Sequence, residues 1–231
     1  KVLSFSQQIY IPIILPTYLC TKYENEMKII DITKTISHDT PTFPGDPHPT
    51  ITRHKSDSVT KDGVFMSDLH LTTHSGTHID APAHVKLGAT GMSSFPVEFI
   101  EGNARVMDIA WLKKFEPIAN RPKKIESIGH DSRMLIFASK SKSEVFPRLQ
   151  PWLADYIKHS GVAILATDLL SIDQIADKHL YNHRLILGKD IWVAENLDLS
   201  NIECGFYRYI FAPMKTSAKD GAPARALLIK D

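Results

Sequence analysis

Two short apolar segments on either side of a helical pattern constrain the fold of this chain more than any other feature. Residues 133–138 and 162–166 each have the length and apolar character of one buried strand. Between them, apolar side chains recur at the spacing of one helix face, at Leu149, Leu153, Tyr156 and Ile157. Gly161 is a helix stop in the right place. The pattern predicts a βαβ unit and therefore a fold of the α/β class.

Four further segments are predicted to be strands, which extends this unit into a mixed β-sheet with flanking helices. They are residues 28–32, 64–73, 191–195 and 207–212. The proline-rich segment 39–49 is expected to form an ordered loop instead. Because no repeat or linker divides the chain, residues 27–231 are predicted to form a single domain, preceded by an N-terminal extension, residues 1–26.

The composition argues against several classes of partner. The 231 residues carry 27 Lys plus Arg against 26 Asp plus Glu, which gives no broad attraction for nucleic acid or an anionic membrane. The most apolar stretch, residues 9–20, is short and contains two prolines, so it cannot cross a bilayer as a helix. The two cysteines, Cys20 and Cys204, show no metal or redox spacing. We therefore expect a cytoplasmic protein that acts on a small molecule, without a nucleic-acid or membrane partner.

Four of the eleven histidines lie within one short segment, His70-Leu-Thr-Thr-His74-Ser-Gly-Thr-His78-Ile-Asp80-Ala-Pro-Ala-His84. Its glycine, its proline and its β-branched threonines disfavour a helix. A strand that continues into a tight loop can instead bring His74, His78 and Asp80 around one point. Two imidazoles and a carboxylate are ligands that zinc, manganese or iron takes in hydrolytic sites. We predict a catalytic metal site here; the alternative is a group of hydrogen-bonded loop histidines that bind no metal.

The motif His74-x-Gly-Thr-His78-x-Asp80-x-Pro-x-His84 resembles the defining motif of the cyclase family of metal-dependent hydrolases. This family includes bacterial-type kynurenine formamidases and isatin hydrolases. Other blocks resemble the family in the same order: Ile30-Asp-Ile-Thr-Lys34, Pro44-Gly-Asp-Pro47, Thr167-Asp-Leu-Leu-Ser-Ile-Asp173 and Asp220-Gly-Ala-Pro-Ala-Arg225-Ala226. The resemblance covers residues 28–229 and implies the cyclase-like swivelling β/β/α fold.

The resemblance also implies a two-metal site. The motif supplies the ligands of the first ion, His74, His78 and Asp80, and the aspartate bridges to a second ion. The second ion takes a later histidine and a later glutamate, which correspond to His183 and Glu195. The expected metal is zinc, with manganese as the alternative, and one or two ions per subunit.

The residues themselves support one of these two assignments. Glu195 shares a strand face with Ile191 and Val193, where a buried carboxylate without a partner is costly. A metal ion would remove that cost. For the histidine, His179 competes with His183 because it lies only four residues earlier. No partners are identified for the three histidines at positions 70, 130 and 159.

His84 is predicted to be the proton-transfer residue. It lies near the ligands without being required as one, and an imidazole that titrates near neutrality suits general acid/base catalysis. The resemblance implies the same role for the last histidine of the motif.

The reaction that these features indicate is hydrolysis of a small amide. The leading case is the conversion of N-formyl-L-kynurenine to L-kynurenine and formate in tryptophan catabolism. Lactam or lactone opening of the isatin-hydrolase type is one alternative, and a non-catalytic metal-binding protein of this fold is another. Phe43 stands where the family often has tryptophan, and it can supply an aromatic wall for an aryl substrate. The family analogy further implies a homo-oligomer, most simply a dimer.

Overall fold

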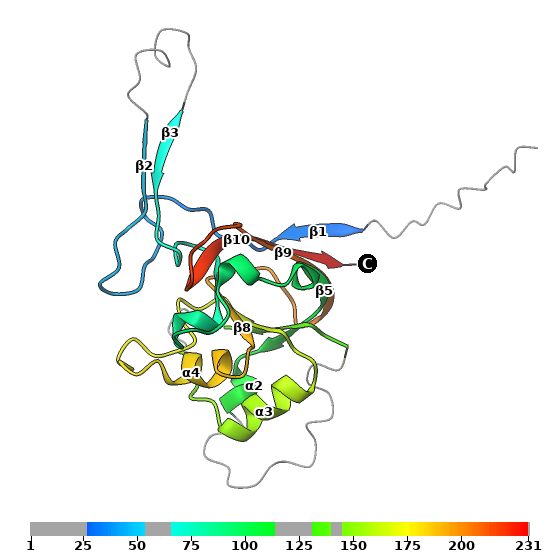
Figure 1. Cartoon of the computed structure of the whole chain (residues 1–231). Coiled ribbons are helices and arrows are strands. Elements are labelled where there is room, and N and C mark those ends of the chain that lie inside the picture. Colours follow the sequence, from blue (N-terminus) through cyan, green and yellow to red (C-terminus); the bar gives the residue numbers. More distant parts are fainter. Residues whose placement is uncertain (1–26, 54–65, 114–130, 140–144, 231) are drawn as a thin grey trace, which may run out of the picture.

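The computed structural model describes residues 27–53, 66–113, 131–139 and 145–230 (Figure 1). The strands are β1 (Lys28–Asp31), β2 (Thr50–Arg53), β3 (Ser67–His70), β4 (His78–Asp80), β5 (Glu101–Asp108), β6 (Met134–Ala138), β7 (Ile164–Thr167), β8 (Trp192–Glu195), β9 (Gly205–Pro213) and β10 (Gly221–Lys230). The α-helices are α2 (Ala110–Lys113), α3 (Pro151–His159) and α4 (Tyr181–Leu187), and three 3₁₀ turns are η1 (Pro82–His84), η2 (Met92–Ser94) and η3 (Val97–Phe99). The predicted extension, residues 1–26, lies outside the described residues.

The strands form a mixed sheet that closes into a barrel. Around the ring the order is β10-β4-β8-β7-β6-β5-β9, and β9 pairs back to β10. Strands β5 to β8 run parallel to one another, whereas β4, β9 and β10 join them by antiparallel pairing. Strand β1 pairs antiparallel with residues 227–230 of β10 and so adds one more strand to the sheet. Strands β2 and β3 form a separate two-stranded sheet that stands away from the barrel (Figure 1).

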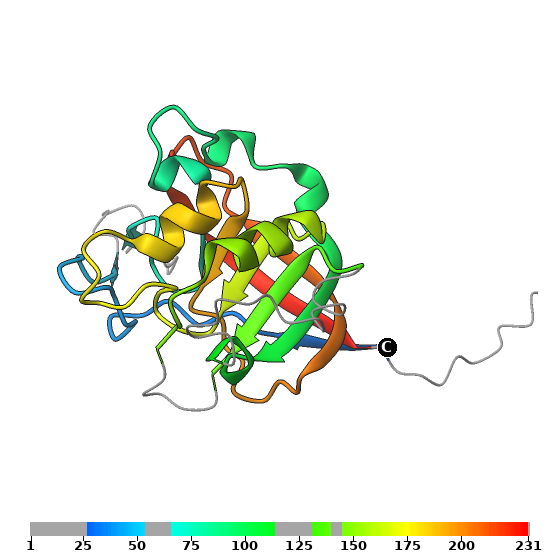
Figure 2. The same ribbon diagram turned by 90° about the horizontal axis from the view of Figure 1, so that it is seen from below.

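Two apolar layers hold the barrel and its helices together. Because successive strand side chains point to opposite faces, β6 sends Met134 and Ile136 into the barrel and Leu135 and Phe137 outward. The outward layer is covered by α3 and α4, which lie across the parallel strands in Figure 2. The helices therefore cover the barrel on the side where its strands are parallel.

The predicted α/β class, with a mixed sheet and flanking helices, is confirmed. The predicted βαβ unit is β6-α3-β7, with the two strands parallel. Leu149 precedes the helix, which begins at Pro151 because proline suits the first helical turn. Gly161 follows the helix with a φ of +84°, a conformation that glycine adopts without strain.

The prediction for residues 64–73 was too long. Only Ser67–His70 forms a strand among the described part of that segment, and the chain then turns so that the Ser75 amide bonds the Thr72 carbonyl at 3.3 Å. The alternation of apolar and polar side chains in the sequence continues past His70, which is why the prediction was too long. The turn ends the hydrogen-bonded pairing of β3 with β2. Residues 64 and 65 lie outside the described residues.

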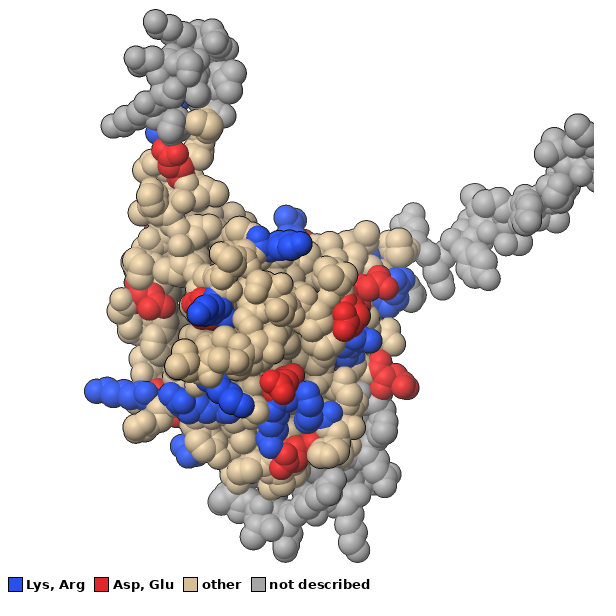
Figure 3. Space-filling view, viewed as in Figure 1, with Lys and Arg blue, Asp and Glu red and all other residues tan. Residues whose placement is uncertain are grey.

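No helix in the described part of the chain is long and apolar enough to cross a membrane. On the face shown in Figure 3, basic and acidic side chains are interspersed.

Candidate metal centre

Three of the predicted ligands stand side by side on the outer face of the barrel. In β4, Ile79 points into the barrel, so its neighbours His78 and Asp80 point outward. Strand β8 has the same alternation, and Glu195 lies directly opposite His78 in the antiparallel register. All three polar side chains are 4% exposed or less. Strand pairing therefore fixes a buried group of one imidazole and two carboxylates.

His74 joins this group from the turn before β4. Gly76 allows the turn with a φ of +65°. The turn brings His74 Nδ1 to 2.8 Å from Asp80 Oδ1, while Nε2 lies 3.1 Å from Asp220 Oδ2. Thr73 Oγ1 donates to the same Asp220 oxygen at 2.6 Å. Asp220, which lies in a block that resembles the family but was given no role, thus orients the His74 ring.

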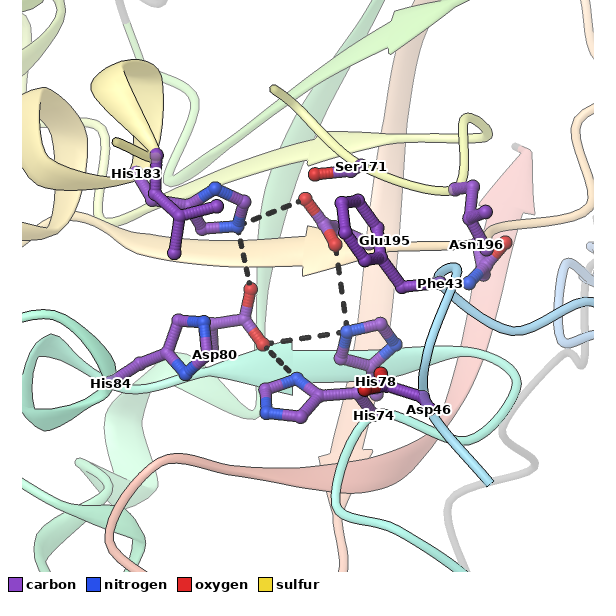
Figure 4. Close-up of a pocket in the computed structure, with 12 residues that line it drawn as sticks. Phe43, Asp46, His74, His78, Asp80, His84, Ser171, His183, Glu195 and Asn196 are labelled. Atoms are coloured by element: carbon purple, nitrogen blue, oxygen red, sulfur yellow. Dashed lines mark hydrogen bonds and ion pairs between the residues drawn. The ribbon is translucent and has the colours of Figure 1, made fainter. Parts of the chain in front are cut away.

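Helix α4 supplies His183 from the opposite side of the group. Its Nε2 lies 3.1 Å from Asp80 Oδ2 and 3.2 Å from Glu195 Oε1 (Figure 4). Its Nδ1 donates to Asp173 Oδ2 at 2.8 Å, which is the carboxylate–histidine arrangement that orients metal ligands. Sequence reasoning gave Asp173 no role. The competing residue, His179, is exposed and lies just before α4, and it is not among the described residues that cluster as possible metal ligands.

Within the described part of the chain, His78 Nε2 makes no hydrogen bond, and Asp80 Oδ1 makes none of regular geometry although His74 Nδ1 lies 2.8 Å from it. His78 Nδ1 donates to the Gly76 carbonyl at 2.9 Å, so its Nε2 is the nitrogen that faces the two carboxylates. That nitrogen lies 3.4 Å from Asp80 Oδ1 and 3.6 Å from Glu195 Oε2. A buried imidazole nitrogen that faces two carboxylates needs a proton or a metal ion between them. One ligand atom each from His74, His78 and Asp80 can be chosen within 4.8 Å of one another, so the residues present fit a divalent metal.

His84 lies beside the ligands in η1. Its ring centre is 4.6 Å from that of His74 and 5.6 Å from that of His183. Burial lowers the pKa of His84, which favours the neutral imidazole at pH 7. Its nitrogen also falls within reach of a metal held by Asp80 and His183. The geometry therefore accommodates either proton transfer or ligation by His84.

Without an ion, protons are bound in this group. Burial lowers the pKa of His74, but the Asp80 carboxylate outweighs it and the pKa rises to about 9. Burial likewise opposes protonation of His183, but Glu195 and Asp173 hold its pKa well above the usual range. The carboxyl of Asp80 is held well below its usual pKa because the surrounding imidazoles outweigh its burial. A metal ion must displace these protons.

The group forms one wall of a cavity of about 220 Å³ (Figure 4). The remaining walls come from loops, with Phe43, Asp46, Leu170, Ser171, Leu180 and Asn196 as lining residues. A cavity of about 150 Å³ can hold a benzene ring, so this one has room for an aryl group. Phe43 is where an aromatic wall was predicted. Elsewhere, His70 and His159 are exposed, and His130 lies outside the described residues.

The chain was compared with known protein families. The family model described as "Putative cyclase" matches residues 30–174. The chain belongs to the cyclase family. The kynurenine formamidase of Salinibacter ruber is 31% identical over 212 residues, which cover 87% of this chain and 97% of that protein. The kynurenine formamidase of Bacillus cereus is 30% identical over 207 residues, which cover 86% of this chain and 96% of that protein.

Solved structures of cyclase-family proteins share the fold. A potential metal-dependent hydrolase with cyclase activity superposes with a TM-score of 0.68 at 23% identity, covering 89% of this chain and 98% of that one. The isatin hydrolase A of Labrenzia aggregata, bound to benzyl benzoate, gives a TM-score of 0.64 at 16% identity, with 88% and 93% covered. These structures confirm the fold, and the family model together with the curated relatives confirms the predicted family.

Proposed function

We propose that this protein hydrolyses N-formyl-L-kynurenine to L-kynurenine and formate. The observation that carries the proposal is the buried group of imidazoles and carboxylates with unpartnered atoms at the wall of a cavity. Relatives at about 30% identity over most of the chain are kynurenine formamidases. The protein is a metal-dependent hydrolase, and a formamide is a small amide that such a site can cleave.

In this proposal His74, His78 and Asp80 hold one ion, while His183 and Glu195 hold a second. Asp80 can serve both, because Oδ1 faces His74 and Oδ2 faces His183. Zinc suits this nitrogen and oxygen donor set, and manganese is the alternative. When bound, such an ion lowers the pKa of water to about 7 and polarises a carbonyl.

The protein's own residues then position the amide and move a proton. Phe43 packs against the aryl ring, and the outer-face cavity encloses the formamide. His84, neutral at pH 7, would take a proton from the attacking water and then give it to the departing aryl amine. Asp173 keeps His183 in the tautomer whose Nε2 faces the site.

Lactam opening of the isatin-hydrolase type is the second candidate. It is supported by the shared fold with isatin hydrolases. Both reactions cleave the bond between an aryl nitrogen and a carbonyl carbon. The formamidase proposal ranks first because the formamidases match the sequence itself at higher identity.

One assay panel tests this order. Protein reconstituted with zinc or manganese is supplied with formylkynurenine, isatin and simple aryl esters, and kcat/KM is measured for each. We expect the highest value for formylkynurenine. A higher value for isatin would replace the first candidate by the second, and hydrolysis of none would refute catalysis.

We further propose that the protein works in the cytoplasm as a homodimer on a small-molecule substrate. The cysteine content supports a reducing compartment, since Cys204 is a free, exposed thiol. The prevalence of twofold assemblies supports the dimer.

A further inference from the structure

Asn196 carries a buried amide nitrogen that has no partner. The residue is 3% exposed, and its Nδ2 makes no hydrogen bond within the described part of the chain. It lines the same cavity as the ligand group and Phe43. Because buried donors are nearly always satisfied, an unpartnered one at a cavity wall indicates a bond to something that enters the cavity.

The backbone of Asn196 is held from several sides. Its amide donates to the Leu169 carbonyl at 3.0 Å, and its own carbonyl accepts from Thr77 Oγ1 at 2.6 Å. These bonds hold a φ of +59°, which asparagine tolerates better than most residues. This conformation explains an asparagine here, but it does not explain why the end of the side chain is unpaired.

Lys34 determines which end of the amide faces the cavity. Its Nζ lies 3.5 Å from Asn196 Oδ1 and donates to the Asp168 carbonyl at 3.1 Å. An ammonium group must face the amide oxygen, so the NH₂ group points away from Lys34. Lys34 lines only the neighbouring cavity, whereas Asn196 lies between the two cavities and lines both. In Figure 4 the nitrogen end of Asn196 lies on the side of Phe43.

The other lining residues narrow the chemistry of the acceptor. No lysine or arginine is present among the described residues that line the cavity, whereas Asp46 and Glu195 are. The ions proposed above are already matched by the carboxylates that hold them, so a further carboxylate at this wall would meet acidic groups without a lysine or arginine to balance it. A neutral carbonyl oxygen is the acceptor that fits.

We propose that Asn196 Nδ2 donates a hydrogen bond to a neutral carbonyl on the aryl ring of the substrate, ortho to the scissile amide. This inference rests on the proposed function, which places an aryl ring against Phe43. In Figure 4, Asn196 and His84 lie on opposite sides of the ligand group. Asn196 thus recognises the ring substituent, while His84 serves the leaving nitrogen.

Two substrates that differ only in this carbonyl test the proposal. Wild-type protein should hydrolyse ortho-acetyl formanilide with a kcat/KM about tenfold above that of formanilide, the usual scale of one good hydrogen bond. Asn196→Asp keeps an oxygen that can face Lys34 and replaces the NH₂ donor by a carboxylate oxygen, which also adds a negative charge. It should abolish the preference, which is the ratio of the two kcat/KM values, so that an effect common to both substrates cancels. Asn201→Asp, at an exposed asparagine, is the matched control and should keep the preference.

Asn196→Gly is the second variant, because glycine adopts the left-handed backbone without strain. It should lose the preference as well. An equal loss on both substrates in these variants, at equal metal content, would overturn the proposal, since Asn196 would then support the fold or the scissile group. A retained preference would overturn it too.

A binding measurement separates this inference from the proposed function. The wild-type protein should bind ortho-aminoacetophenone about tenfold more tightly than aniline by calorimetry, and Asn196→Asp should remove the difference. Equal binding of the two amines by wild type refutes the role of Asn196. Absence of hydrolysis with intact discrimination in binding would refute the proposed reaction alone.

Discussion

At the scale of single residues, His84 and Asp80 differ in what they contact, so their loss should differ in kind. His84→Ala removes the imidazole beside the ligands and should leave the metal bound. General acid/base catalysis contributes about 10²–10⁴-fold, so kcat for formylkynurenine should fall by about that factor. The measurements are kcat and metal content per chain by elemental analysis.

Two other variants make this prediction specific. Asp80→Ala should lose metal and activity together, because it removes the carboxylate that faces both His74 and His183. His179→Ala, at an exposed histidine near α4, should change neither. Loss of metal from His84→Ala would show that His84 is a ligand.

At the scale of elements, β10 supports the site through a residue without a side chain. Gly221 pairs with Asp80, and a Cβ there would lie 2.7 Å from the Ile79 carbonyl and 3.2 Å from His74 Cε1. Gly221→Ala should therefore weaken metal binding and lower the free energy of unfolding by about 1–3 kcal/mol, as overpacking does. Chemical denaturation and metal titration measure the two effects.

The matched control is Gly205→Ala on β9, where the nearest atom to an added Cβ is 3.8 Å away. It should keep the metal affinity of the wild type. Equal metal affinities of the two alanine variants would show that the close packing of β10 against His74 and Asp80 does not affect metal binding.

Strand β8 and helix α4 together should determine how many ions bind. Glu195→Gln and His183→Ala each remove a predicted ligand of the second ion, so metal content should fall from about two ions per chain to about one. Equilibrium dialysis followed by elemental analysis gives the ratio. Full loading of both variants would support a mononuclear site instead.

The elements that sequence reasoning predicted are those with a strong local pattern. Strand β6 is apolar throughout, β7 is apolar up to its last residue, Thr167, and α3 repeats at helical spacing, so neighbouring residues were sufficient to identify them. Strand β4 was predicted as a loop because its three residues place two polar side chains outward. Strand β10 begins Gly-Ala-Pro-Ala-Arg, which resembles a turn. Both form through pairing with distant segments.

The candidate site shows the same limit. The spacing of His74, His78 and Asp80 along the chain is enough to indicate a common site, and the family resemblance adds His183 and Glu195. Asp173 and Asn196 were given no role, because their partners, His183 and Lys34, are identified only by the folded chain.

At the scale of the whole molecule, metal binding should release protons. His74 has a pKa of about 9 without metal and is protonated at pH 7, so an ion must displace that proton. Metal affinity should therefore rise from pH 7 to about 9 and then level off. Calorimetry in two buffers of different ionisation enthalpy measures the released protons, and no release at pH 7 would contradict the prediction.

The same shift has a consequence for the metal-free protein. Because the pKa of His74 is raised above 6.5 on folding, its contribution to stability is present below about pH 6.5 and is lost as the pH rises through about 9. The unfolding midpoint of metal-free protein should fall between about pH 6.5 and about pH 9. The unfolding midpoint of metal-loaded protein should not show this fall.

The protein is predicted to be a homodimer. Strands β2 and β3 stand away from the barrel and expose most of their residues, and a two-stranded sheet is marginally stable alone. A second copy would cover it. Light scattering at micromolar concentration should give a particle of about 52 kDa, twice the chain mass of 26.0 kDa. A particle of the chain mass would refute the dimer.

Because β4 pairs with β10, the metal site can be completed only late in the synthesis of the chain. Asp80 and Gly221 are neighbours in the barrel but lie about 140 residues apart along the chain. At about 5–20 residues per second, a ribosome finishes β4 about 7–28 s before it reaches β10. Until β8 is made, β4 lacks both neighbouring strands, and from then until β10 is made it lacks one. A nascent chain that stops before Gly221 should therefore have no hydrolase activity, even though it already contains every proposed metal ligand.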